Sequence, residues 1–241
     1  MRRPKLRSEP RFSANKLAEY MTAAGPTKRR SLIVDQIVSP TTKILNYEHA
    51  RAAARRILSD PSRNAQSWMR AASRLRDSAA NTPDEFDARC MRLSAQALEA
   101  FAPSSHLIRA GGAVVVAGRR QWGALTLAGV RVSLSPEASL LEVGSEHRIG
   151  AIQFHFSKTA LKTEGLQYVA AMLVEALSQS GDSARRALCI AVDAFTGGVV
   201  DAPRAMKTRM RDLESACEEI TERWPALYSE QLAKYAELSE G

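Results

Sequence analysis

The chain reads IGAIQFHFSKTALKTEGLQYVAAMLVEALSQSGDSARRALCIAVDAF over residues 149–195. The runs 149–156 and 188–195 are short, apolar and bounded by polar residues, which is typical of strands. Between them, residues 163–180 place Leu166, Leu173 and other apolar side chains at helical spacing. A strand, a helix and a second strand in this order favour an α/β fold.

Further strands precede this unit, and helices lie on both sides of it. Runs separated by glycines at 114–116, 125–127 and 130–134 predict three strands. We therefore expect an α/β fold with a central mixed sheet of about four to six strands flanked by helices. The predicted organisation is a flexible basic arm (1–11), a helical region (12–102) and an α/β core with C-terminal helices (103–241).

The composition excludes several classes of protein. The 241 residues are 45% apolar and 25% charged, which is typical of a globular chain. No apolar run approaches the roughly 20 residues of a membrane-spanning helix, and the basic N-terminus lacks the apolar core of a secretion signal. We expect no membrane partner and a cytoplasmic location. Cys90, Cys189 and Cys217 are widely spaced, which predicts buried free thiols rather than disulfides or a zinc site.

Charge is distributed unevenly along the chain. There are 34 Lys and Arg against 26 Asp and Glu, a net charge of +8. Residues 1–30 hold nine basic and two acidic side chains, whereas residues 212–241 hold eight acidic and two basic ones. A basic front half favours a nucleic acid bound through its phosphates, and the alternative is a solvated helical face. The predicted nucleic-acid contacts are Lys28, Arg29, Arg30, Arg55, Arg56, Arg70 and Arg74.

Two short motifs lie in the strand region. Pro136-Glu137 precedes one strand, and Ala151-Ile152-Gln153 lies on the next. With the order helix, three strands, helix, strand from Pro83 to Pro203, they resemble the PD-(D/E)XK nuclease superfamily. The resemblance implies a restriction-endonuclease-like core in which two acids hold Mg²⁺ or Mn²⁺ and a lysine assists the attacking water. Because Ala151 and Gln153 stand where the family has acid-x-Lys, the implied metal site is incomplete.

The candidate catalytic residues are Glu137, Gln153, Lys158 and Asp193, with Glu137 and Asp193 as the metal ligands. The resemblance implies that Lys158 would take the place of the family's lysine from a different position. It also implies that Glu99 is the nearest match to an acid on the family's first helix. Glu137 is either a ligand or a solvated residue at the start of a strand. Gln153, with His155, belongs either to the site or to a half-exposed strand face. Asp193 interrupts an apolar strand, so it is either a turn-capping residue or an active-site acid.

Three functions follow from these observations. The first is a nucleic-acid-associated protein with an incomplete metal site that binds DNA or RNA mainly through phosphate contacts. An alternative is an active nuclease that depends on a divalent metal and uses relocated catalytic residues. The other alternative is a non-enzymatic subunit, in which the acidic C-terminal helices dock a basic protein partner or a second copy of the chain.

Overall fold

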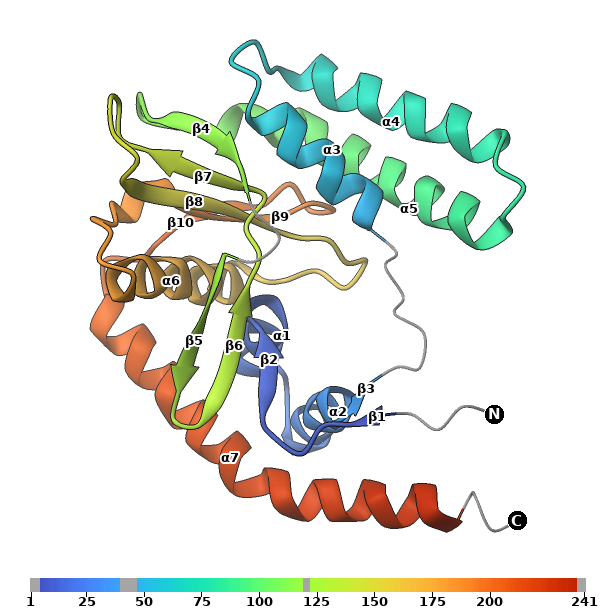
Figure 1. Ribbon diagram of the computed structural model, residues 1–241, viewed down its shortest axis with the longest axis vertical. Coiled ribbons are helices and arrows are strands. Elements are labelled where there is room, and N and C mark those ends of the chain that lie inside the picture. The colour runs from blue at the N-terminus through green and yellow to red at the C-terminus, as the bar shows by residue number, and fades with distance from the viewer. Residues whose placement is uncertain (1–4, 40–46, 119–121, 238–241) are drawn as a thin grey trace.

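The computed structural model describes residues 5–39, 47–118 and 122–237 (Figure 1). The helices are α1 (Ala14–Met21), α2 (Pro26–Ile37), α3 (Glu48–Leu58), α4 (Ala65–Ala80), α5 (Glu85–Phe101), α6 (Thr163–Gln179) and α7 (Met206–Glu237), with short 3₁₀ helices at Ala102–Leu107 and Arg186–Leu188. The strands are β1 (Lys5–Leu6), β2 (Arg11–Ser13), β3 (Val38–Ser39), β4 (Val114–Ala117), β5 (Gly123–Leu127), β6 (Val130–Leu134), β7 (Ala138–Leu141), β8 (Arg148–His155), β9 (Cys189–Asp193) and β10 (Val199–Asp201). The expected α/β fold class is confirmed.

The main sheet has five strands in the order β10, β9, β8, β7, β4. Strands β8 and β9 are parallel, with Ile152 beside Ile190, and α6 connects them. The other neighbouring strands are antiparallel. The sheet is therefore the central mixed sheet expected from the sequence. Pro136-Glu137 precedes β7, the strand expected there, and separates it from β6, which belongs to a different sheet.

Helices cover both faces of the main sheet (Figure 1). Helices α3, α4 and α5 lie over one face, where Phe154 of β8 stacks on Trp68. Helix α6 lies over the other face, which Ala151 helps to fill. Gln153 and His155 point to this second face and are only 3% exposed each. The expectation of a half-exposed face is wrong there, because α1 and α6 cover it.

A second sheet contains β2, β6 and β5 in that order. Strands β5 and β6 form a hairpin whose turn residues, Ala128 and Gly129, both have positive φ, as a type I′ turn requires. Strand β2 pairs in parallel with β6, and β1 pairs with β3. Much of the segment expected to be a flexible arm is therefore tied into sheets from Lys5 onward. Residues 1–4 of that segment lie outside the described residues.

Two apolar cores result. One core lies among α1, α2, α6, α7 and the second sheet. The other lies between the main sheet and helices α3, α4 and α5. The predicted helical region 12–102 thus contributes to both cores. The three cysteines are buried and free, as predicted. Burial raises the pKa of Cys189 and of Cys217 to about 12, so both thiols stay protonated at neutral pH.

The C-terminal region is one helix of 32 residues, α7, rather than the several helices expected. Pro225 lies inside it, where proline removes one backbone hydrogen bond. Trp224 and Leu227 on either side are buried in the core beneath, and this packing holds the helix together across the proline. In Figure 1, α7 passes along α6 and then beneath α2.

Replacing Trp68 tests the core between the main sheet and helices α3, α4 and α5. Trp68 is 1% exposed, and its ring meets the rings of Phe101 and Phe154 at centroid distances of 4.8 and 5.7 Å. Trp68→Ala is expected to lower the free energy of unfolding by about 3–5 kcal/mol. Met69, the next residue on α4, is 47% exposed. Met69→Ala is therefore expected to change the free energy of unfolding by less than about 0.5 kcal/mol. Guanidinium-induced unfolding measures both, and equal losses would contradict the assignment of Trp68 to the core.

Candidate functional site

An arginine-lined groove lies between the second sheet and α3. One hollow of 670 Å³ is lined by Arg11 of β2, Arg131 of β6, and Arg51 and Arg55 of α3. A second hollow of 410 Å³ shares Arg11 and Arg131 and adds Arg7. We call the two hollows together the arginine groove. Its sheet wall carries Arg11 and Arg131, and its helix wall carries Arg51 and Arg55.

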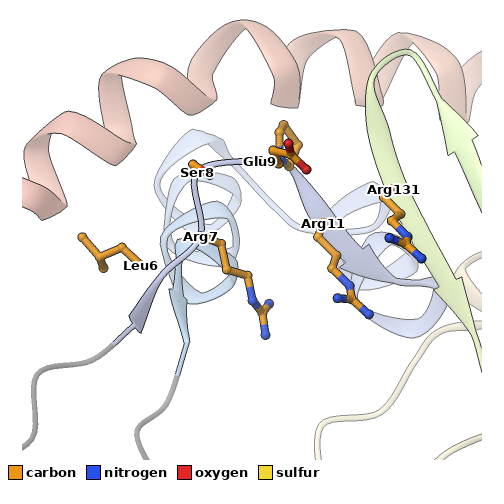
Figure 2. A pocket seen from close by; sticks show the side chains of 7 residues that line it. Leu6, Arg7, Ser8, Glu9, Arg11 and Arg131 are labelled. Carbon is orange, nitrogen blue, oxygen red and sulfur yellow. The ribbon is translucent and has the colours of Figure 1, made fainter.

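Strand pairing places the two arginines of the sheet wall side by side. Arg11 is the register partner of Arg131 in the parallel pair of β2 and β6. Alternation turns their neighbours Phe12 and Val132 into the core and leaves both guanidinium groups outside. Figure 2 shows the side chains of Arg7, Arg11 and Arg131 pointing to the same side of the chain.

The sheet wall carries positive charge that Glu9, an exposed acid lining the same hollow, does not pair with among the described residues. Neither Arg11 nor Arg131 forms an ion pair within the described ranges 5–39, 47–118 and 122–237. Like charges at directly opposed positions of neighbouring strands destabilise a sheet. An anion placed between the two side chains removes this repulsion, and a guanidinium group can hold a phosphate through two parallel hydrogen bonds. The pair is therefore suited to an external anion.

The helix wall carries two more arginines, each with a carboxylate beside it. Arg55 lies 3.8 Å from Glu48, which is about two turns earlier on the same helix. Arg51 Nη1 donates to Glu137 Oε1 at 2.6 Å and reaches the backbone carbonyl of Ser135 at 3.3 Å. Over both hollows, five guanidinium groups thus face three carboxylates, those of Glu9, Glu48 and Glu137, which leaves the groove with excess positive charge.

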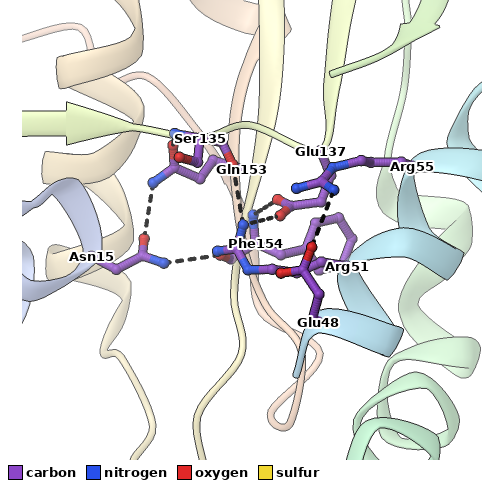
Figure 3. Close-up of polar contacts among 8 residues, drawn as sticks. All are labelled: Asn15, Glu48, Arg51, Arg55, Ser135, Glu137, Gln153 and Phe154. Carbon is purple, nitrogen blue, oxygen red and sulfur yellow. Dashed lines mark hydrogen bonds and ion pairs between the residues drawn. The ribbon is translucent and has the colours of Figure 1, made fainter. Parts of the chain in front are cut away.

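Glu137 connects the helix wall to β8 (Figure 3). Its side chain is fully buried, and while Oε1 accepts from Arg51, Oε2 accepts the amide of Phe154 at 2.7 Å. Its own amide donates to the carbonyl of Ile152 at 2.8 Å. Glu137 is therefore a buried structural carboxylate that joins α3 to β8, and the expectation of a solvated residue at this position is wrong.

Gln153 forms the floor of the groove. Its side-chain oxygen accepts the amide of Ser135 at 3.2 Å, and its side-chain nitrogen donates to the Asn15 side chain at 3.1 Å (Figure 3). Asn15 in turn donates to the carbonyl of Phe154 at 2.9 Å. This network fixes α1 against β8, and it places a neutral amide where a metal-dependent nuclease of the resembled family has a lysine.

Asp193 is a turn-capping residue, the first of its two interpretations. Oδ1 accepts the amides of Phe195 and Thr196, and Oδ2 accepts the amide of Leu161. These three bonds satisfy a fully buried carboxylate and fix the loop that follows β9.

The residues present do not fit a Mg²⁺ or Mn²⁺ site. In the part of the chain that the structure describes, no group of three or more His, Cys, Asp or Glu side chains could hold a metal ion. The carboxylates of Glu137 and Asp193 are each bound by their own partners. Lys158 is exposed on the loop after β8, and Glu99 pairs with Arg76 in the helical layer. The predicted catalytic residues therefore do not form one metal-binding cluster.

The predicted nucleic-acid contacts do not form one surface either. Arg29 and Arg30 of α2 pair with Glu219 and Glu230 of α7. Arg56 and Arg74 line a different hollow, between α3 and α4, while Lys28 and Arg70 are exposed elsewhere. Of the seven, Arg55 alone lines the arginine groove. The seven contacts predicted from the sequence do not include the other arginines that line the groove, which are Arg7, Arg11, Arg51 and Arg131.

Comparisons with known proteins add no family. No protein-family model matches the chain, and a search of curated proteins finds no match to it. Among the described helices, none combines the length and the apolar character needed to cross a membrane.

The buried pair of Arg51 and Glu137 predicts a pH-dependent loss of stability on mutation. Burial raises the pKa of Glu137 above its usual value, and Arg51 and the Phe154 amide oppose that rise. A raised pKa means that folding favours the protonated carboxyl, so this contribution to stability falls as the pH rises through the raised pKa. Arg51→Met leaves the carboxylate unpaired and raises that pKa further.

We expect Arg51→Met to cost about 3–5 kcal/mol of unfolding free energy at pH 7 and less at pH 5, where Glu137 is more readily protonated. Adding Glu137→Gln to this variant should recover part of the loss, because no unpaired charge is then buried. Arg56→Met, on the exposed side of the same helix, is the matched control. Urea unfolding at both pH values measures these effects, and a loss that is independent of pH would exclude the pairing.

Proposed function

We propose that the protein binds nucleic acid through its phosphates and that the arginine groove is the binding site. The observation that carries this proposal is the side-by-side placement of Arg11 and Arg131 without an acidic partner among the described residues. Arg7 on one side and Arg51 and Arg55 on the other extend the positive surface along the groove. A row of guanidinium groups matches a ligand with regularly repeated phosphates better than it matches a single small anion.

Binding of this kind is dominated by backbone contacts. Phosphate contacts position a nucleic acid without reading its sequence, and each one releases counterions. We therefore expect a steep dependence on salt and little base preference. The net charge of +8 supports a long-range attraction to polyanions.

We assign no catalytic role to the residues that resemble the nuclease motifs. Glu137 and Gln153 support the walls and floor of the groove, and Asp193 supports a loop. A binding protein rather than a metal-dependent nuclease fits these contacts better. A cytoplasmic location fits the three free, buried thiols.

Charge-matched double variants test the proposed site. Arg11→Gln/Arg131→Gln removes two charges from the sheet wall, whereas Arg70→Gln/Arg74→Gln removes two exposed charges from α4. The two double variants therefore have the same net charge. The first variant is expected to weaken binding of labelled oligonucleotides about tenfold or more and to lower the slope of log affinity against log salt by roughly 2. The second is expected to lose less than about threefold.

Fluorescence anisotropy over a series of salt concentrations measures both variants. Equal losses would mean that net charge, not the groove, determines binding. No binding by the unaltered protein at low salt would overturn the proposed function.

A further inference from the structure

We infer that the arginine groove takes a single strand of nucleic acid rather than a duplex. This inference rests on the proposed function and narrows its ligand. It follows from the two opposed walls of the groove, from the depth of the groups between them and from the aromatic residues at one end.

The positive groups of the groove face it from two sides. Arg11 and Arg131 stand on the sheet wall, and Arg55 stands on the helix wall with its side chain only 16% exposed. The floor between them includes Gln153, which is 3% exposed. A single strand of nucleic acid that enters the groove can contact both walls and the floor at once. A duplex carries its phosphates on the outside of a wide cylinder, so it reaches the rim at Arg7, Arg11 and Arg131 but not the recessed groups.

Arg55 also has a donor that the protein leaves unused. Its Nε is buried and has no hydrogen-bond partner among the described residues. A buried donor without a partner costs about 1–3 kcal/mol unless a ligand or water satisfies it. A phosphate in the groove is an acceptor of the right charge, and because Nε has almost no exposed surface, the Arg55 side chain must turn toward the phosphate for this bond to form.

Aromatic side chains continue the groove beyond α3. A third hollow of 320 Å³ shares Asn15, Glu48 and Arg51 with the arginine groove and is also lined by Tyr47 and Phe156. Tyr47 and Phe156 are half-buried, and their rings are stacked at a centroid distance of 6.2 Å. Phe156 is also stacked on Phe154 at 5.2 Å, which leaves Tyr47 as the ring that a base can contact. Unpaired bases make apolar contacts with aromatic groups, and only a single strand offers such bases. Arginines followed by aromatics along one groove are the combination that single-strand binding uses.

Two variants separate binding inside the groove from binding on its rim. Ala124 is an exposed residue of β5 that lines the groove, so Ala124→Leu narrows the groove without changing its charge or adding an aromatic ring. Ala80→Leu, at the exposed end of α4, is the matched control. Arg55→Gln removes the recessed cation of the helix wall, and its partner Glu48 stays partly solvated.

The probes are fluorescein-labelled oligothymidylate, oligouridylate, and a duplex of oligothymidylate with oligoadenylate, measured by anisotropy at one salt concentration. The unaltered protein is expected to bind a single strand of either sugar about tenfold more tightly than the duplex. Ala124→Leu and Arg55→Gln should each weaken single-strand binding about fivefold or more and leave duplex binding within about twofold. Ala80→Leu should change neither.

Each result decides the inference. Single-strand and duplex binding of equal strength, both lost in Arg11→Gln/Arg131→Gln, would overturn the inference and leave the proposed function intact. Tighter duplex binding would overturn it in the same way, as would single-strand binding that Ala124→Leu does not weaken. Absence of binding to all three probes would overturn both.

Discussion

The structure depends on one buried carboxylate, that of Glu137. A fully buried charge is stable only while it is paired and hydrogen-bonded, and Glu137 meets this condition through Arg51 of α3 and the Phe154 amide of β8. Helix α3 must therefore lie where Arg51 reaches the start of β7. Arg55 follows Arg51 by one turn on the same helix, so the pairing that fixes α3 also fixes the helix wall of the groove.

The opposite wall depends on a strand pairing rather than on a charge. The apolar side chain of Phe12 anchors β2 in the core, and it forces the adjacent Arg11 outward beside Arg131. The repulsion between these arginines is a cost that the burial of Phe12 and Val132 offsets, at roughly 1.5–3 kcal/mol for each apolar side chain buried. The two walls thus have independent causes, and the groove is the space that both leave open.

The sequence predicts the main sheet better than it predicts the site. Strands 149–156 and 188–195 and the helix between them show their spacing locally, and the structure confirms them. Strand β2 has three residues, and its partner β6 lies far along the chain, so no local pattern reveals the pairing. Glu137 stands out in the sequence as a motif residue, but its partner Arg51 comes from another element. Local patterns therefore cannot tell a buried structural carboxylate from a metal ligand.

Folding also redistributes the charge that the sequence displays. The acidic helix α7 lies against α2, where Glu219 and Glu230 neutralise Arg29 and Arg30. Such exposed pairs add little stability, at most about 1 kcal/mol each, but they remove these arginines from the surface available to a polyanion. The arginines of the sheet wall have no such partner among the described residues, so their field is not cancelled locally. A groove with apolar protein behind it concentrates that field. This concentrated field is the physical basis on which we propose a thin, flexible chain of closely spaced negative charges as the ligand.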